Sequence, residues 1–508
     1  MIKILTFFKN YFFWIIFSSI LISRFLFLDF GLPLIPQADE TELVEYPLNY
    51  AVNIKKLFEG DVRFFKPFSF VYGTFPSYLN TIFLAGFLKV TSLFDLSQDR
   101  YFIYLFLRSI YVLISAATCV LVYFLIKTLT QNQAVVKITT LLFSLNFTFL
   151  ILSKYINNDV LIVFFGVLFL YIFQKYKSSL NYKSILVLGL ILGLGVGTKI
   201  TFALFALIPT IYLIYKKKIK LLIFLSLVSI LFYALSNPFT FLNFNEFYQR
   251  ILEMRVKENG IVIDSFNPNP LKYFNSIQNN LSISILVFFI LGIGMSIYKR
   301  NFNLIMFIVI IHIVFFSLSS RLVDRWLVPI YPFILFYAVD FISKFKIKII
   351  SNLIFVLMFI NVGLYFSLIN IEYSQTPNII ESFDYFRKTL NISNSKILVI
   401  THRGQQPFSS LNNKNGNILT DFQFNPYESE GAFNSPPPSF ENYDYVIFSS
   451  RVSDYYSNPE IEKINPKFKE NWDNYFQNLK NSFNLEKSFN TDFSLLKQEN
   501  ILVFKRKN

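Results

Sequence analysis

The stretch RSIYVLISAATCVLVYFLI, residues 108–126, decides the fold class of this chain. A helix needs roughly 20 apolar residues to cross the hydrocarbon core of a bilayer, and this stretch is close to that length. Similar runs recur along the first 370 residues, and 54% of the chain is hydrophobic while 16% is charged. Soluble globular chains carry about 25% charged residues. The pattern therefore predicts a membrane protein that crosses the bilayer many times.

We predict a membrane all-α fold, a polytopic bundle of about 11 transmembrane helices, followed by a small external α/β domain at the C-terminus. The predicted spans are 11–28, 108–126, 134–152, 160–174, 184–198, 200–215, 219–236, 281–297, 303–318, 326–342 and 348–368. Lysines precede the first run, and no small-residue cleavage site follows it. We therefore expect a retained first span rather than a signal peptide.

Basic residues gather in the loops between alternate runs, which is the pattern of cytoplasmic loops. The net charge is +15, and this placement makes nucleic acid an unlikely partner. The predicted location is the plasma (inner) membrane, with the N-terminus in the cytoplasm and the C-terminal domain on the periplasmic or extracellular side. The basic residues in question are Lys127 and Lys137; Lys175, Lys177 and Lys183; Lys216 to Lys220; Lys299 and Arg300; and Lys344, Lys346 and Lys348.

Two domains are expected, a transmembrane catalytic domain over 1–369 and an external domain over 370–508. The first contains a long external loop, about 30–107. Residues 78–95 in this loop are apolar enough for a short span. A span there would turn every later lysine-rich loop outward, so we predict an interfacial helix on the outer leaflet.

The external domain is predicted from a change in composition after residue 370, where polar residues, proline and asparagine become frequent. Short runs rich in β-formers predict strands, and two longer patterns predict helices. The expected strands are 396–400, 443–450 and 500–504, and the expected helices are about 378–390 and 466–484.

Cysteine and histidine are scarce, which limits cofactor chemistry. The chain has one cysteine, Cys119, and two histidines. An internal disulfide and a cysteine-based zinc site are therefore excluded. No cofactor is predicted with certainty, and the sequence gives no argument for a divalent metal, which would have to be held mainly by oxygen ligands.

Three acidic residues, in two places, stand out on the predicted outer side. Asp39 and Glu40 follow the first span, and a carboxylate at the membrane surface can serve as a general base; the alternative is an ordinary solvated loop. Asp159 begins an apolar run, where a charged side chain costs free energy in a membrane. Its presence there therefore suggests a function. The alternative for Asp159 is a helix cap.

Three cations fall on the same predicted side. Lys199 lies in a tight turn between two apolar runs. Its ammonium group either extends to the membrane–water interface or faces an anionic group. Arg321 and Arg325 are four residues apart at the head of another run, where two arginines on one helical face can bind a phosphate. Anchoring at the interface is the alternative. Together, the acids and cations suit a site that binds a lipid phosphate and activates a hydroxyl group.

The order of these features resembles GT-C type membrane glycosyltransferases, of the family 39 and family 83 kind: protein O-mannosyltransferase-like and aminoarabinose-transferase-like enzymes. The resemblance covers about residues 11–345, and the Asp39-Glu40 pair is its most specific part. It rests on RFLFLDFGLPLIPQADET (24–41), YAVNIKKLFEGD (50–61), FVYGTFPSYLN (70–80), RSIYVLISAATCVLVYFLIKTL (108–129), the loop at Asp159, GLGVGTKIT (193–201) and RLVDRWLVPIYP (321–332).

The resemblance implies an inverting glycosyltransferase that uses a polyprenyl-phosphate sugar as donor. It implies Asp39 as catalytic base, Glu40 as its neighbour in the motif, and Asp159 as a second acid in the site. By the same analogy Lys199, Arg321 and Arg325 face the donor phosphate. The partners would be the lipid-linked sugar, membrane lipids and an acceptor hydroxyl on a protein, lipid or cell-surface glycan.

Two other functions remain open on the sequence alone. A transporter or flippase for a lipid-linked saccharide would also need many spans and charges near the membrane. Such proteins often carry ionisable residues deep in their spans and internal repeats, and neither is evident here. A non-catalytic scaffold that presents the C-terminal domain gives no reason for the acids and cations to share one side.

Overall fold

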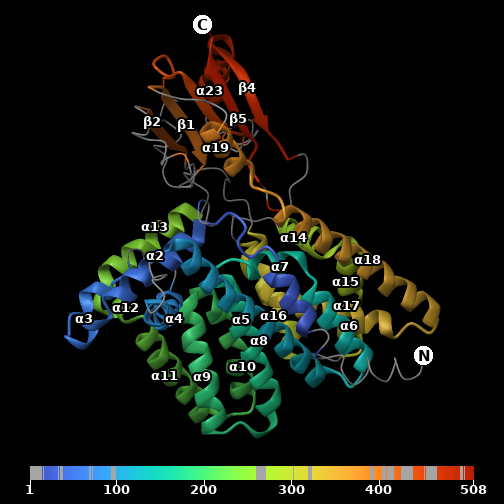
Figure 1. Cartoon of the computed structure of the whole chain (residues 1–508). Coiled ribbons are helices and arrows are strands. Elements are labelled where there is room, and N and C mark those ends of the chain that lie inside the picture. Colours follow the sequence, from blue (N-terminus) through green and yellow to red (C-terminus); the bar gives the residue numbers. More distant parts are fainter. Residues whose placement is uncertain are drawn as a thin grey trace. The chain divides into compact units, whose positions relative to one another are not determined.

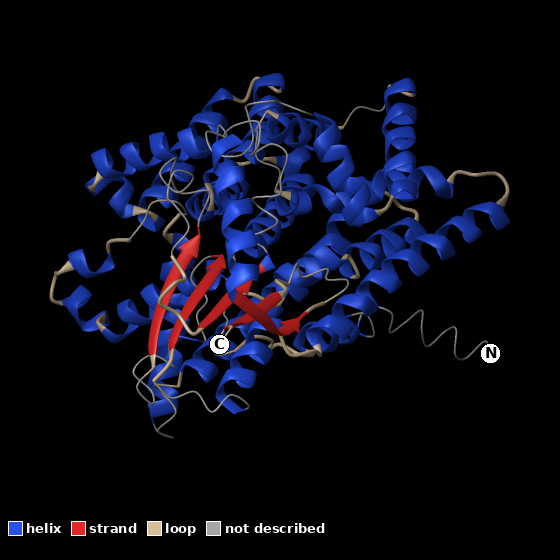
Figure 2. Ribbon diagram, turned by 90° about the horizontal axis from the view of Figure 1, so that it is seen from above, coloured by secondary structure: helices blue, strands red, loops and turns tan. Residues whose placement is uncertain are grey.

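The computed structural model describes the chain except residues 1–13, 15–16, 33, 35–37, 68–69, 71–72, 93–98, 259–269, 301–302, 319–322, 389–393, 403–407, 409–416, 425–438, 451, 453–465, 492–495, 497 and 508. The chain forms two compact units (Figure 1). Unit 1 comprises Met1–Leu28, Glu42–Met254 and Pro268–Leu368, and unit 2 comprises Asp29–Thr41, Arg255–Asn267 and Ile369–Asn508. Figure 2 shows that helices dominate and that the strands form one sheet.

Long apolar helices make up unit 1, as the sequence predicts. Within the described residues, five helices are long and apolar enough to cross a membrane, or up to seven if two bent pairs each count as one span. Three further apolar segments are shorter, Tyr182–Thr198, Ile200–Tyr215 and Leu304–Ser317. The number of 11 spans stays a prediction, and the predicted span 11–28 lies partly outside the described residues.

The helices that correspond to the predicted spans have the following bounds. They are α5 (Arg100–Leu129), α6 (Gln133–Ser144), α7 (Phe147–Ser153), α8 (Asn158–Tyr176), α9 (Tyr182–Thr198), α10 (Leu207–Tyr215), α11 (Ile219–Ser236), α15 (Ile283–Tyr298), α16 (Leu304–Ser317), α17 (Tyr331–Ser343) and α18 (Lys348–Tyr373), with the 3₁₀ helices η3 (Lys177–Ser179), η4 (Ile200–Ala206) and η5 (Asp324–Ile330).

One predicted span, 134–152, is broken, and another, 281–297, follows a sharp bend. α6 and α7 meet at 56°, where Asn146 caps α7 by accepting a hydrogen bond from Phe149 N. α14 (Pro270–Leu281) and α15 meet at 119°. Ser282, between them, has a φ of 104°, a left-handed conformation that costs free energy for a residue other than glycine. The apolar pattern continues across the break at Asn146, so hydrophobicity alone carries no signal for that bend.

Glycines allow α9 to pack closely on α11. A Cβ atom on Gly193 would lie 2.6 Å from Ser229 O, and one on Gly197 would lie 2.4 Å from the Asn237 side chain. Both distances are too short for any side chain. This packing brings the ends of α9 and α11 together, beside the turn that carries Lys199.

The segment predicted as the first external loop folds into short helices. Its elements are α2 (Ala38–Val52), α3 (Ile54–Phe58), η1 (Val62–Phe65) and α4 (Phe75–Thr91), while α12 (Pro238–Leu242) and α13 (Phe244–Glu258) follow α11. α4 confirms that a helix lies near residues 78–95. Its position on the outer leaflet stays a prediction. Tyr50, Phe65, Phe70 and Phe239 form a buried aromatic cluster that joins this loop to α12.

Unit 2 contains the C-terminal sheet that the sequence predicts. Its strands are β1 (Lys396–His402), β2 (Ile418–Phe424), β3 (Tyr445–Ser449), β4 (Phe483–Phe489) and β5 (Ile501–Arg506), in the order β2-β1-β3-β5-β4. β1 pairs in parallel with β2 and β3, and β5 pairs antiparallel with β3 and β4. β2 and β4 were not predicted, because polar residues interrupt their apolar pattern.

Helices cover both faces of this sheet, because successive side chains of a strand point to opposite faces. Ile397 and Val399 pack in one cluster with Phe386 of α19 (Asn378–Lys388). Leu398 and Ile400 pack in the other with Trp472 of α23 (Pro466–Ser482). Both helices match the expected helical segments, so the α/β character of this region is confirmed.

Candidate functional site

Asp159 lies in the first turn of α8, and its position is fixed by the residue that caps the helix. Asn157 is the cap, since its side-chain oxygen accepts a hydrogen bond from Val160 N at 3.0 Å. Asp159 is therefore free of the capping role considered from the sequence. Its side chain is almost completely buried, and a helix N-terminus favours a negative charge there.

The carboxylate of Asp159 pairs with two cations from distant segments. Lys199 Nζ lies 2.9 Å from Asp159 Oδ1, and Arg325 Nε lies 2.9 Å from Asp159 Oδ2. The lysine and arginine side chains are 16% and 28% exposed, whereas that of Asp159 is 9% exposed. The cluster has a formal charge of +1, and its positive groups are its more accessible part.

Lys199 ends α9 in an extended conformation and directs its side chain toward α8. Its backbone N–H closes the helix by donating to Gly195 O at 3.0 Å. The ammonium group also lies 5.6 Å from the centre of the Trp326 ring, within the range of a cation–π contact. Trp326 directly follows Arg325 in η5 and is a further residue of this site.

Arg325 lies in η5, which begins at Asp324 after the extended residue Val323. Arg321 lies outside the described residues, so its pairing with Arg325 on a phosphate stays a prediction. Asp324 accepts a hydrogen bond from Ser276 Oγ at 2.6 Å.

A buried set of hydrogen bonds fixes the turn that carries Lys199. Thr74 N donates to Asn237 Oδ1 and Thr74 Oγ1 donates to Ser236 O, both at 2.6 Å. Gly73 N donates to Thr198 O at 3.3 Å. A Cβ atom on Gly73 would lie 1.8 Å from Gly197 O, so only glycine fits there. We call Gly73, Thr74 and Asn237 the turn lock; sequence analysis missed it, because its members are far apart along the chain.

Asp39 and Glu40 occupy the first turn of α2, where the helix dipole favours acidic residues. Glu40 is fully buried and Asp39 is partly exposed. Both belong to unit 2, whereas Asp159, Lys199 and Arg325 belong to unit 1. The structure thus brings three of the six predicted site residues together, and the catalytic roles of Asp39 and Glu40 stay predictions.

Three buried cations surround the end of the first helix. Arg108 Nη1 donates to Leu28 O at 2.7 Å, and Lys154 Nζ donates to Leu26 O. Arg24 Nη2 donates to Ser144 O at 3.1 Å. Burial, followed by the charges of Arg24 and Arg108, lowers the pKa of Lys154 to about 7. Arg108 and Lys154 thus satisfy backbone carbonyls at the end of the predicted span 11–28, whereas Arg24 satisfies the last carbonyl of α6.

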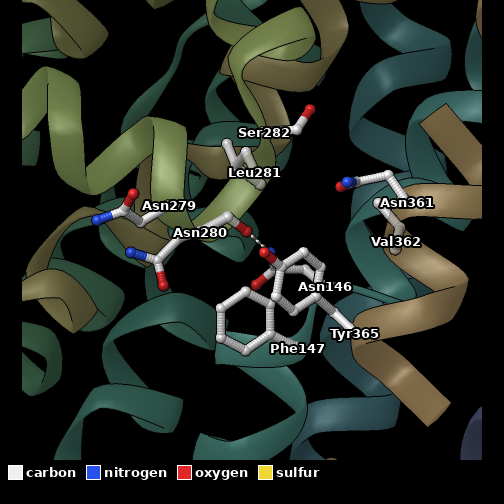
Figure 3. A pocket seen from close by; sticks show the side chains of 9 residues that line it. All are labelled: Asn146, Phe147, Asn279, Asn280, Leu281, Ser282, Asn361, Val362 and Tyr365. Atoms are coloured by element: carbon white, nitrogen blue, oxygen red, sulfur yellow. Dashed lines mark hydrogen bonds between the residues drawn. The ribbon is translucent and has the colours of Figure 1, made fainter. Parts of the chain in front are cut away.

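A second polar network runs from Asp324 into the break between α14 and α15. Asn280 Nδ2 donates to Ser276 O at 2.8 Å, and Thr148 Oγ1 donates to Asn280 Oδ1 at 2.5 Å. Asn146 Nδ2 donates to Asn280 O at 2.9 Å. Figure 3 shows this last bond at the edge of a small pocket. The hydrogen bond from Ser276 to Asp324 ties α14 to the start of η5, and so helps to position Arg325.

Metal ligands do not gather in this site. Over the residues that the structure describes, no three histidine, cysteine, aspartate or glutamate side chains lie close enough to hold a metal ion.

A protein-family model matches part of the chain. The model of the family described as "Dolichyl-phosphate-mannose-protein mannosyltransferase" matches residues 84–248, less than half of the chain. This segment includes Asp159 and Lys199. A curated Aquifex aeolicus (strain VF5) protein, described as uncharacterized, is 28% identical over 256 residues, 49% of this chain and 50% of that protein. The matched region thus spans about half the length of this relative.

Solved structures match the whole fold. ArnT from Cupriavidus metallidurans, crystallised with undecaprenyl phosphate, has a TM-score of 0.52 at 10% identity and covers 97% of this chain and 98% of its own. The apo oligosaccharyltransferase of Archaeoglobus fulgidus has a TM-score of 0.51 at 12% identity and covers 88% of this chain and 71% of its own. The resemblance to GT-C type membrane glycosyltransferases, predicted from the sequence, is therefore confirmed at the level of the fold.

Proposed function

We propose that this chain is an integral-membrane inverting glycosyltransferase. It moves a sugar from a polyprenyl-phosphate donor to an acceptor hydroxyl on a protein, lipid or cell-surface glycan at the outer face of the membrane. The observation that carries the proposal is the cluster of Asp159, Lys199 and Arg325, in which one buried acid holds two cations at the ends of apolar segments.

The two cations are proposed to bind the donor phosphate. A sugar phosphate is a good leaving group when fixed positive charges meet the charge that develops on the phosphate oxygens. Lys199 offers a point charge and Arg325 a planar guanidinium, which differ in geometry but both suit phosphate. Asp159 holds both groups before the donor arrives, so little reorganisation is needed on binding.

Asp39 is proposed as the base. It removes the proton from the acceptor hydroxyl while the hydroxyl oxygen forms a bond to the anomeric carbon. The bond from this carbon to the phosphate oxygen breaks, and its electron pair leaves with the lipid phosphate. Attack from the opposite face inverts the anomeric centre in one step. No general acid is required, because the phosphate leaves as an anion stabilised by Lys199 and Arg325.

Support for this proposal also comes from the comparisons. The matching family model is named for a dolichyl-phosphate-mannose donor. One structural neighbour, ArnT, was crystallised with undecaprenyl phosphate. Both names point to a sugar linked to a polyprenyl phosphate, although the matches themselves are to a part of the chain and to the fold.

The test is sugar transfer or slow hydrolysis by the purified full chain with a panel of polyprenyl-phosphate sugars. Wild type and Asp39→Asn are compared in one detergent, with matched thermal stability as the control for folding. We expect the wild type to release sugar from one or a few donors. The variant should lose at least about a hundredfold in rate, the usual contribution of a positioned base.

Equal release by wild type and Asp39→Asn would remove Asp39 from catalysis. Binding of the lipids without release from any donor would instead favour a transporter or flippase for a lipid-linked saccharide. Binding and release are measured separately, so these two results are distinguishable.

A further inference from the structure

Exposed apolar side chains concentrate in one part of the first external loop. Residues 52–64, which we call the α3 tip, comprise the end of α2, all of α3 and the start of η1. Phe58 is 86% exposed and Val52 is 68% exposed. Leu57, Val62 and Phe64 of the same tip are exposed as well. Single exposed apolar residues are ordinary, but contiguous ones mark a surface that binds something.

The α3 tip has a defined backbone. Asp61 N donates to Lys56 O at 2.9 Å and Gly60 N donates to Leu57 O at 3.2 Å, which ends α3 in a tight turn. Gly60 has a φ of 84°, a conformation that favours glycine. The Asp61 side chain then caps η1 by accepting from Arg63 N. The exposed side chains thus sit on an ordered element.

Contacts within unit 1 hold this element near the ends of two apolar helices. Tyr78 OH donates at 3.0 Å to the carbonyl oxygen of Phe65, the residue that directly follows the tip, and this joins η1 to α4. The start of α4 is joined in turn, through the turn lock, to the ends of α9 and α11. The end of a transmembrane helix marks the membrane surface, so these contacts bring the tip to that level. Figure 1 shows α3 at the left margin of this unit.

Cations accompany the apolar side chains. Lys56 Nζ lies 3.4 Å from the centre of the Phe64 ring, and Lys55 is exposed. Neither lysine forms a salt bridge with the residues that the structure describes. Arg63 is already paired with Asp61 at 3.0 Å, and Glu59 offsets one charge. Two lysines beside an apolar tip match the layered chemistry of a bilayer surface, with anionic phosphates above hydrocarbon.

We propose that the α3 tip inserts Phe58 and its apolar neighbours into the interface of the predicted outer leaflet. Lys55 and Lys56 bind the phosphates of anionic phospholipids there. The tip is then a second membrane attachment, separate from the transmembrane helices, that fixes the first external loop on the bilayer. This inference is independent of the proposed glycosyl transfer, since its test does not use activity.

The test uses the single cysteine of the chain. Cys119 is buried and is replaced by serine, and a new cysteine then carries an environment-sensitive fluorophore. The probe position is Phe58→Cys. Leu227→Cys on α11 and Leu485→Cys on β4 serve as matched controls, because both leucines are exposed apolar residues. The full chain is reconstituted into vesicles of neutral lipid with or without phosphatidylglycerol.

We expect the probe at residue 58 to be quenched by lipids that carry a nitroxide near the headgroup and to be shielded from aqueous iodide. The probe at 227 should be quenched by deeper nitroxides, and the probe at 485 by iodide. A probe at 58 that behaves like the probe at 485 would overturn the insertion.

The lysines are tested by Lys55→Gln with Lys56→Gln in the Phe58→Cys background. Phosphatidylglycerol should increase the inserted fraction of the parent, by about fivefold in the ratio of inserted to aqueous probe for each lysine. The double variant should lose this dependence. An unchanged response to phosphatidylglycerol would refute headgroup binding by these lysines and leave only apolar insertion.

Discussion

At the scale of single residues, Asp159 matters because it holds two cations that would otherwise repel each other. Breaking a buried ion pair by removing one partner costs about 3–5 kcal/mol, and partial exposure reduces that cost. Lys199 and Arg325 are partly exposed. We therefore expect substitutions of these cations to affect donor binding more than folding.

Lys199→Met is expected to raise the KM for the lipid-linked donor by about tenfold or more, because one charged hydrogen bond to phosphate is worth about 1.5–3 kcal/mol. Lys199→Arg should recover part of the loss. Steady-state kinetics with a series of donor concentrations measures the effect. Lys216→Met, which alters an exposed lysine, is the control. A donor KM that is unchanged in Lys199→Met would exclude this lysine from the phosphate site.

The lowered pKa of Lys154 makes the free energy of unfolding depend on pH. Its pKa in the folded chain is lowered to about 7, against about 10.4 for an ordinary lysine. Between these two values the unfolded chain binds more protons, so the free energy of unfolding rises as pH increases from about 7 to 10. Below about pH 7 both forms are protonated, and the dependence disappears.

The melting temperature of the purified chain should accordingly rise by a few degrees between pH 7 and pH 9.5. Lys154→Met should show a smaller rise, because the lysine no longer titrates. Lys216→Met again serves as the control and should behave like the wild type. Identical pH profiles for wild type and Lys154→Met would mean that Lys154 keeps an ordinary pKa.

At the scale of elements, the turn lock connects three turns and sets the position of Lys199. Gly73→Ala places a Cβ against Gly197 O and should lower the melting temperature and raise the donor KM together. Gly86→Ala is a matched control, since it lies in α4 with nothing within 4 Å of its Cβ. It should be neutral or slightly stabilising. Equal effects of both substitutions would show that the lock does not position the lysine.

Asn237→Ala probes the same lock without added bulk. It leaves the buried Thr74 backbone N–H without its acceptor, which costs about 1–3 kcal/mol. The expected signature is a raised donor KM that Asn237→Asp partly restores, because the aspartate oxygen still accepts from Thr74 N. A loss of stability with unchanged KM in both variants would assign the lock to folding alone.

Element positions could be predicted well where the local pattern determines them. Apolar runs predicted the long helices, and β-rich runs predicted β1, β3 and β5. Charges at the ends of apolar runs predicted that Asp159, Lys199 and Arg325 share one site, and the structure brings these side chains together. The bends at Asn146 and Ser282, the turn lock, and the start of η5 after Val323 depend on contacts between distant segments, so no local pattern reveals them.

At the scale of the whole molecule, the fold is shared with ArnT over 97% of this chain at 10% identity. So low an identity means that the pattern of apolar helices, rather than particular side chains, carries the fold. Function has to be argued from the site instead. The proposed reaction gives phosphate binding to Lys199 and Arg325 and proton removal to Asp39, and separate variants test the two roles.

The most direct test of this account follows both products of the reaction in sealed proteoliposomes. Wild-type protein receives a polyprenyl-phosphate sugar that it binds, together with an extract of outer-surface acceptors, and mass spectrometry measures the lipid and the sugar. We predict free polyprenyl phosphate and glycosylated acceptor in equal amounts, both nearly absent with Asp39→Asn. Intact lipid-linked sugar that crosses the bilayer without cleavage would contradict the account and identify a transporter.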